Sequence, residues 1–162
     1  NFETFWLLNT EMTKNVLLGR LPYAHQTYQN QQETFNLKCK FTGEKTQGNV
    51  VVHRHLENKE FDKYMTTTCG FLDLLDTSAN NGVTDCISRN IPLLINCHPA
   101  VVEYLGDDYP FYYNTLESAN KKIKDIQLVK DTYEYLKNMN KSRFDMHTFI
   151  NEFINSNIYQ SL

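Results

Sequence analysis

The sequence predicts an α/β protein built on a parallel sheet that helices cover on both faces. Short runs that are apolar throughout recur along the chain, which is typical of strands buried on both sides. Segments with a helical spacing of apolar residues lie between those runs, so each strand can reach the next through a crossover helix. A length of 162 residues suits one domain with a substantial core.

The first part of the chain alternates short apolar segments with polar ones. In chain order, the expected elements are a helix at 2–8, strands at 14–19 and 50–52, and a helix at 56–67. Residues 20–48 are rich in Gln, Thr and Asn and show little periodicity, so we expect a loop-rich segment with a short strand at 37–41. Asn58 is the expected N-cap of the helix that follows the second strand.

The second part of the chain has clearer boundaries between its elements. The expected elements are strands at 70–76, 93–96 and 109–113, a helix that begins near 80 and ends at 89, and a helix at 100–105. Pro92 separates the first of these helices from the next strand, and Gly106 stands where a helix C′ glycine belongs. Helices at 116–124, 126–139 and 144–158 follow, with Ser118, Ser142 and Asp145 as candidate caps.

The composition argues against several classes of protein. With 16 basic and 19 acidic residues the net charge is −3, so we expect no nucleic-acid partner. No run approaches the ~20 apolar residues of a membrane span, so we expect no transmembrane segment. The cysteines at 39, 69, 86 and 97 fit no zinc spacing and indicate a reducing, cytoplasmic location. The chain begins with Asn and without a signal-peptide pattern, so we expect a fragment of a longer protein.

The candidate binding residues follow the strand that ends at Asp76. In parallel sheets, ligands bind at the carboxyl ends of the strands, which here means residues 53–58, 76–82 and 96–100. The turn TSANNG at 77–82 enters a helix whose first N–H groups have no helical partner. Those groups and the helix dipole favour a phosphate or diphosphate. Asp85, one turn into the helix, suits a sugar or ribose hydroxyl.

The same stretch carries a resemblance to a known family. The run DTSANNGVTDCISRNIPLLIN at 76–96, followed by PAVVEYLGDDYP at 99–110, resembles the C-terminal half of a GT-B glycosyltransferase. It is similar to the class that includes glycosyltransferase family 4, and to a subgroup of viral and bacterial glycosyltransferase-like proteins. The resemblance is close over 69–113 and loose over the rest. It implies a Rossmann-like parallel sheet, with residues 1–162 forming a single donor-binding domain.

The resemblance also implies a reaction and a set of site residues. The donor would be a nucleoside-diphosphate sugar, used as a co-substrate without a resident cofactor or metal. Its diphosphate and sugar would face Thr77, Ser78, Ala79, Asn80, Asn81 and Gly82, with His55, His98 and Pro99 also in contact with the donor. Asp85 would bind donor hydroxyls, and Arg54 would stabilise the leaving diphosphate. An N-terminal domain and the first strand of this domain would lie before Asn1, and that domain would bind the acceptor glycan or other acceptor.

The sequence departs from the family pattern at two positions. Thr77 stands where the first acid of the usual pair belongs, and Ala100 replaces the acid of the Pro-Glu loop. These departures favour an alternative, a non-catalytic nucleotide-binding or protein-interaction module of the same fold. A flavodoxin-like or response-regulator-like domain, phosphorylated on Asp76, is a third interpretation.

Plainer interpretations also stand beside the individual residues. The Asn-Asn-Gly turn can serve as an Asx-type cap alone, and Asp85 can simply complement the helix dipole. His53 and His55 suit hydrogen-bonded histidines at a strand end better than a metal pair.

Overall fold

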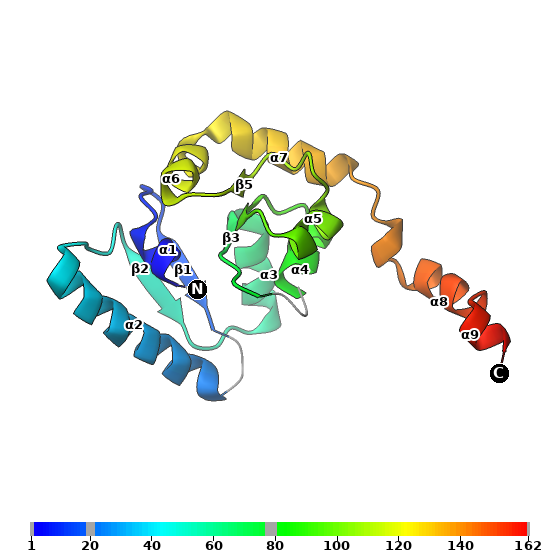
Figure 1. The fold of residues 1–162 in the computed structure, drawn as a ribbon, viewed down its shortest axis with the longest axis horizontal. Helices are drawn as coiled ribbons and strands as arrows, with labels where there is room; N and C mark the ends of the chain where they lie inside the picture. Colours follow the sequence, from blue (N-terminus) through cyan, green and yellow to red (C-terminus); the bar gives the residue numbers. More distant parts are fainter. Residues whose placement is uncertain (1, 19–21, 77–80, 162) are drawn as a thin grey trace.

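The computed structural model describes residues 2–18, 22–76 and 81–161 (Figure 1). The strands are β1 (Lys14–Leu17), β2 (Val50–His53), β3 (Gly70–Leu72), β4 (Leu93–Asn96) and β5 (Tyr112–Tyr113). The helices up to β5 are α1 (Glu3–Leu7), α2 (Pro22–Thr42), α3 (Asn58–Thr67), α4 (Asn81–Arg89) and α5 (Pro99–Leu105). After β5 come α6 (Leu116–Lys124), α7 (Ile126–Asn138), the 3-10 turn η1 (Ser142–Phe144), α8 (Met146–Ile154) and α9 (Asn157–Gln160).

The strands are parallel, as expected, but those of the described residues form two small sheets instead of one. β1 pairs with β2, with Lys14 opposite Val50. β3, β4 and β5 form the other sheet in that order, with Gly70 opposite Leu93. The α/β class is therefore confirmed, whereas a single continuous sheet is not what these residues form.

The larger core surrounds β4, whose Leu93, Leu94 and Ile95 are almost completely buried. Helices cover this strand, and the buried side chains that pack around it are Val83, Cys86, Ile87, Val101, Leu105, Phe111, Ala119, Ile123 and Leu136. This arrangement explains the uninterrupted apolar run at 93–95, because a strand covered on both faces has no solvent-facing side. The buried Tyr109 is fixed against β4, because its hydroxyl accepts from the N–H of Leu93 and donates to the C=O of the same residue.

The smaller core lies between α1, β1 and α2, and it corrects the expectation of a loop at 20–48. That segment is mostly a helix of 21 residues, and no strand forms at 37–41. Only a narrow stripe of α2 is buried, at Tyr28 and Phe35, which both contact the ring of Trp6. Most of the remaining side chains are polar, and the apolar Tyr23, Leu37 and Phe41 are exposed, so the helical periodicity was hidden. The stripe stabilises the fold only because Trp6, which is distant in sequence, packs against it.

Several element boundaries also differ from the expectations. β3 ends at Leu72 instead of Asp76, and the N-cap of α3 is Glu57, not Asn58. Ser118 is the third residue of α6, which Thr115 caps. Asp145 is confirmed as a cap, since its carboxylate accepts from the N–H of Thr148 at 3.0 Å.

Gly106 also occupies its expected place after α5. Its φ of +84° favours glycine, and an added Cβ would lie 2.9 Å from the hydroxyl of Tyr135.

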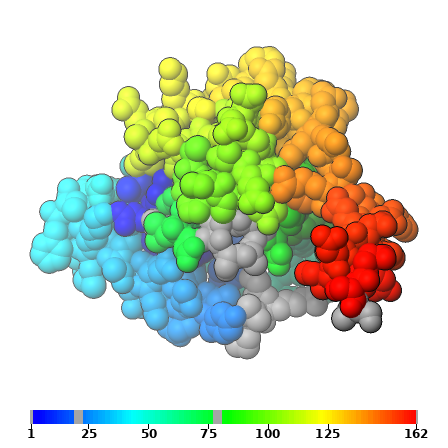
Figure 2. All heavy atoms as spheres, turned by 45° about the vertical axis from the view of Figure 1, so that its right-hand side comes forward, coloured from blue at the N-terminus to red at the C-terminus, as the bar shows by residue number. Residues whose placement is uncertain are grey.

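The C-terminal helices α8 and α9 extend away from the rest of the molecule (Figure 1). Their atoms are the red ones at the lower right of Figure 2. A single helix at 144–158 was expected, but the chain turns between these two helices at Asn155 and Ser156. Their large apolar side chains are exposed, namely Met146, Phe149, Ile150, Phe153, Ile154, Ile158 and Tyr159. The larger core therefore stops near Phe144, whose ring stacks on Tyr104.

Candidate functional site

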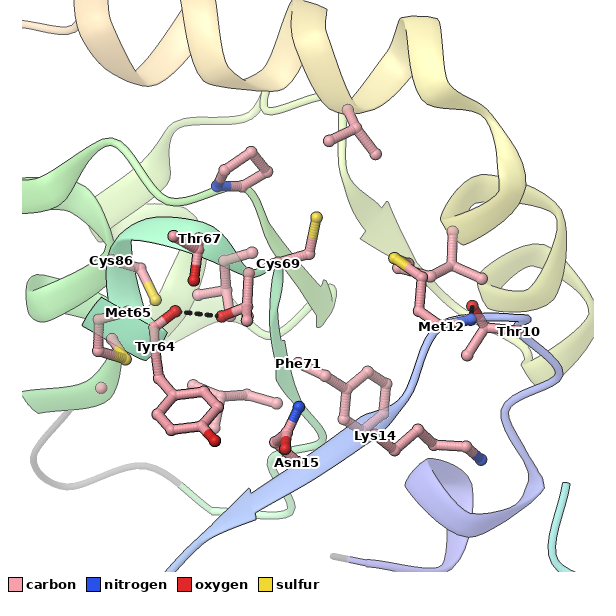
Figure 3. Close-up of a pocket in the computed structure, with 18 of the residues that line it drawn as sticks. Thr10, Met12, Lys14, Asn15, Tyr64, Met65, Thr67, Cys69, Phe71 and Cys86 are labelled. Atoms are coloured by element: carbon pink, nitrogen blue, oxygen red, sulfur yellow. Dashed lines mark hydrogen bonds between the residues drawn. The ribbon is translucent and has the colours of Figure 1, made fainter. Parts of the chain in front are cut away.

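A large hollow lies between the two sheets. It is a cavity of about 1240 Å³, with β1 on one side and β3 on the other (Figure 3). Most of its wall is apolar, with Phe5, Met65, Phe71 and Val129 among the lining residues. The space is larger than the ~300–1,000 Å³ that is usual for small-molecule pockets.

Two of the predicted site residues line this cavity, and both belong to α4. They are Gly82, in the first turn of the helix, and Asp85, one turn further along. An added Cβ on Gly82 would meet Leu72 at 3.5 Å, which is an ordinary contact, so packing within the protein does not demand glycine here. Asn81 begins the helix and is exposed. Thr77, Ser78, Ala79 and Asn80 lie outside the described residues.

Asp85 is held by an ion pair within its own helix. Its carboxylate accepts a hydrogen bond from Nη1 of Arg89 at 2.6 Å, and Nη2 of Arg89 also reaches Asp62 of α3 at 3.2 Å. The hydrogen bond that Arg89 donates to Asp85 is the largest cause of the raised pKa of Arg89. The side chain of Asp85 is still 43% exposed, so a ligand can reach it. The arrangement therefore orients a carboxylate at the wall of the cavity.

The other predicted residues lie outside the cavity wall. Arg54 follows β2 and is exposed, while His55 Nε2 lies 3.0 Å from Glu57 Oε1. His53 Nε2 lies 2.9 Å from Asn15 Oδ1, and its ring packs 4.8 Å from that of Tyr64. The interpretation of both histidines as hydrogen-bonded residues at a strand end agrees with these contacts. Among the described residues, no group of three or more His, Cys, Asp or Glu side chains is placed to hold a metal ion.

His98 and Pro99 form the N-terminal boundary of α5. His98 is the N-cap, and its Nδ1 accepts a hydrogen bond from the N–H of Ala100 at 3.2 Å. Pro99 is the first helical residue, a position where its fixed φ suits the helix and its missing N–H costs nothing. Both residues therefore have a structural role in starting this helix, and the structure does not bring them to the cavity.

Sequence reasoning missed a polar group at the carboxyl end of β3. The amide of Asn96 bonds to both the N–H and the C=O of Leu74, at 2.8 and 2.7 Å, and so fixes the segment after the strand. Asp73, which lines the cavity, accepts a hydrogen bond from Thr4 of α1 at 2.7 Å. Burial, and then the charge of Asp73, raise the pKa of Tyr113. In the sequence, the signal for this polar group was that Asp73 interrupts an apolar run.

Lys14 is the other residue that the sequence did not single out. Its side chain is 4% exposed, and its ammonium donates to the C=O groups of Phe5, Trp6 and Leu8 at 2.8, 3.0 and 2.7 Å. These carbonyls belong to the end of α1, where a positive charge is favourable. Burial lowers the pKa of Lys14 to about 8. The lysine thus fastens α1 to β1 beside the cavity.

Burial keeps the cysteines near the cavity in the protonated thiol form. All four cysteines of the chain are free, and Cys86 and Cys69 line the cavity. Burial raises the pKa of the Cys86 thiol to about 12 and also raises that of Cys69. A nucleophilic cysteine mechanism would need a thiolate, so these residues contribute apolar surface instead.

Comparison with known proteins identifies no relative of this chain. No protein-family model, no curated protein and no solved structure matches this chain. Within the described residues, none of the helices combines the length and the apolar character that crossing a bilayer requires.

Proposed function

We propose that this chain is the donor-binding domain of a GT-B-like glycosyltransferase and binds a nucleoside-diphosphate sugar. The observation that carries the proposal is the position of α4. This helix follows β3 in a parallel sheet, and its first two turns place Gly82 and Asp85 at the wall of a large cavity. Anionic ligands favour such a helix start, because its N–H groups lack helical partners.

In this proposal the two ends of the donor meet different groups. The diphosphate binds the backbone around Asn81 and Gly82. The hydroxyls of the sugar or ribose bind Asp85, whose carboxylate Arg89 already orients. Arg54, exposed after β2, is proposed to stabilise the leaving diphosphate when donor and acceptor are both bound. The acceptor would bind a separate domain of the same protein.

A binding module without catalysis is the alternative, and one observation favours it. The salt bridges from Arg89 to Asp85 and Asp62 connect α4 with α3, which gives Asp85 a structural use independent of any sugar. Such a module would still bind the nucleotide but would not transfer the sugar.

The experiment compares two carboxylates that share Arg89. Asp85 lines the cavity, whereas Asp62 does not, so D85N and D62N each remove one partner of the same guanidinium. Isothermal titration with UDP-glucose, GDP-mannose, UDP and GDP at millimolar concentration measures binding. We expect binding of a nucleotide sugar that D85N weakens about tenfold or more, equivalent to about 1.4 kcal/mol, and that D62N leaves nearly unchanged.

Two outcomes would contradict the donor site. One is that no nucleotide or nucleotide sugar binds the wild-type chain. The other is an equal loss of binding in D85N and D62N, because a loss shared by both variants would act through Arg89 and the α3–α4 contact. Binding of the nucleotide without sugar transfer to any acceptor, measured in the full-length protein, would favour the alternative module.

A further inference from the structure

The start of α4 carries a pair of residues with a chemistry of its own. In the whole sequence Asn-Gly occurs once, at Asn81 and Gly82, and Asn-Ser occurs once, at Asn155 and Ser156. The backbone nitrogen that follows an asparagine can attack the amide carbon of its side chain and close a five-membered succinimide ring. A Cβ on the following residue hinders this closure, so glycine permits it best. Asn81 is therefore the asparagine whose neighbour most favours loss of the side-chain amide.

The structure leaves this pair at the surface, ahead of the point where α4 enters the core. Asn81 and Gly82 are both exposed. The first buried side chain of the helix is Val83, which is completely inside the larger core, and Cys86 and Ile87 continue the same buried face. Opening of the helix ahead of Val83 moves none of these core side chains. Such a local opening costs much less free energy than global unfolding.

Ring closure depends on that opening. The nitrogen of Gly82 must approach Cγ of Asn81, so the ψ angle of Asn81 has to leave its helical value. In the closed helix the C=O of Asn81 accepts a hydrogen bond from the hydroxyl of Thr84 at 3.0 Å, and this contact is exposed. Water replaces that bond when the turn opens, and glycine gives the backbone its greatest freedom at the next position. The first turn can therefore reach the reactive geometry while the helix from Val83 onward stays in place.

We propose that Asn81 and Gly82 form a site of spontaneous deamidation at the start of α4. The nitrogen of Gly82 gives its proton to solvent and bonds to Cγ of Asn81. The bond from Cγ to Nδ2 breaks, and the amide nitrogen takes up a proton and leaves as ammonia. Water then opens the ring at Cγ to give aspartate, or at the backbone carbonyl to give isoaspartate. Water is consumed and ammonia is released, so the conversion requires no oxidant, reductant or cofactor.

Either product places a new carboxylate at the start of the helix. A negative charge is favourable in the first turn, so the aspartate form keeps the helix folded. The same charge repels an anion, and it lies where the diphosphate of the donor is proposed to bind. Deamidation would thus weaken binding at that position. This consequence rests on the proposed function, whereas the deamidation itself does not.

The test follows the side-chain amide of Asn81 over time in the complete chain. The folded wild type, the Gly82→Ala variant and the wild type unfolded in urea are incubated at physiological temperature and mildly alkaline pH. Peptide mass mapping with detection of isoaspartate measures the conversion. Gly82→Ala is the matched control, because its Cβ would meet Leu72 at 3.5 Å, an ordinary contact. Asn155, which is exposed and precedes Ser156, is the internal reference.

We expect Asn81 in the folded wild type to convert at a rate within about tenfold of its rate in urea, because opening one exposed turn costs little free energy. In Gly82→Ala, and at Asn155 of the wild type, conversion should be slower by about tenfold or more, because a Cβ hinders ring closure. An Asn81 that converts in urea and stays intact in the folded chain would overturn the proposal, since the helix would then protect it. Equal conversion in Gly82→Ala would also overturn it. The comparison of folded and unfolded wild type is decisive even where melting curves show that the variant does not fold.

A separate titration tests the consequence for the anion site. Wild-type protein is titrated with UDP before and after conversion of Asn81. Weaker binding after conversion would support the proposed repulsion, and equal binding would contradict it. The deamidation readouts contain no nucleotide, so a fresh wild-type chain that binds no UDP would count against the donor site and not against the modification.

Discussion

The β4 region and the β1–β2 region differ in how far their strands are buried. In β4, Leu93, Leu94 and Ile95 are each at most 1% exposed, because helices and neighbouring strands surround them. In β2, Val51 is 37% exposed, and a compact aromatic cluster around Trp6 supplies most of the burial nearby. The comparison teaches that the first region is stabilised by continuous apolar packing, and the second by a few large rings and a buried lysine.

The largest effect is expected from a truncation in the β4 region. Leu94→Ala removes a completely buried side chain that has no room to relax, so we expect a loss of about 4 kcal/mol of unfolding free energy in urea titration. Val51→Ala is the matched control in β2 and should cost less than about 1 kcal/mol, because this side chain is partly in solvent. Similar losses at both positions would remove the distinction between the regions.

A smaller loss of stability is expected in the β1–β2 region, together with a local change in hydrogen exchange. Phe35→Ala removes a buried side chain of α2, and we expect a loss of about 3 kcal/mol. Because α2 contacts the body through this narrow stripe, hydrogen exchange should accelerate in α2 before it does in β4. Leu37→Ala, on the exposed side of the same helix, is the control and should leave exchange unchanged. Uniform acceleration over both regions would show that they unfold as one unit.

The smallest effect is the pH dependence that Lys14 adds to its region. Its pKa is lowered to about 8 in the fold, against 10.5 for an ordinary lysine. Between these values the unfolded chain binds more protons, so the contribution of Lys14 to stability rises with pH over this window. We expect the wild type to gain about 2 kcal/mol relative to Lys14→Arg between pH 8 and pH 10, measured by urea unfolding.

The arginine variant is the reference because its side chain stays protonated throughout this range. The raised pKa values of buried tyrosines such as Tyr109 affect both proteins alike, so they cancel in the difference. Stability curves that run parallel from pH 8 to pH 10 would contradict the assignment of a buried, weakly basic lysine.

In the candidate site, some residues could be predicted from their neighbours in the sequence, whereas the roles of others depend on contacts with distant residues. The sequence indicated Asp85 and Gly82, because a polar turn before a helix is a local signal, and both residues line the cavity. It could not show that His98 is used as the cap of α5 or that His53 bonds to Asn15. It also could not show that Arg89 would hold Asp85 while reaching across to Asp62, since Asp62 lies on another helix.

By itself, the sequence determined the parallel α/β class, the strand at 93–96 and the positions of most helices after it. Those features depend on neighbours within a few residues, such as uninterrupted apolar runs, caps and the glycine after α5. Only the tertiary structure decided that 22–42 is a helix and that the strands divide between two sheets with a cavity between them. The reason is physical: a narrow apolar stripe or a short strand is stabilised by the element that packs or pairs with it, and that partner is distant in sequence.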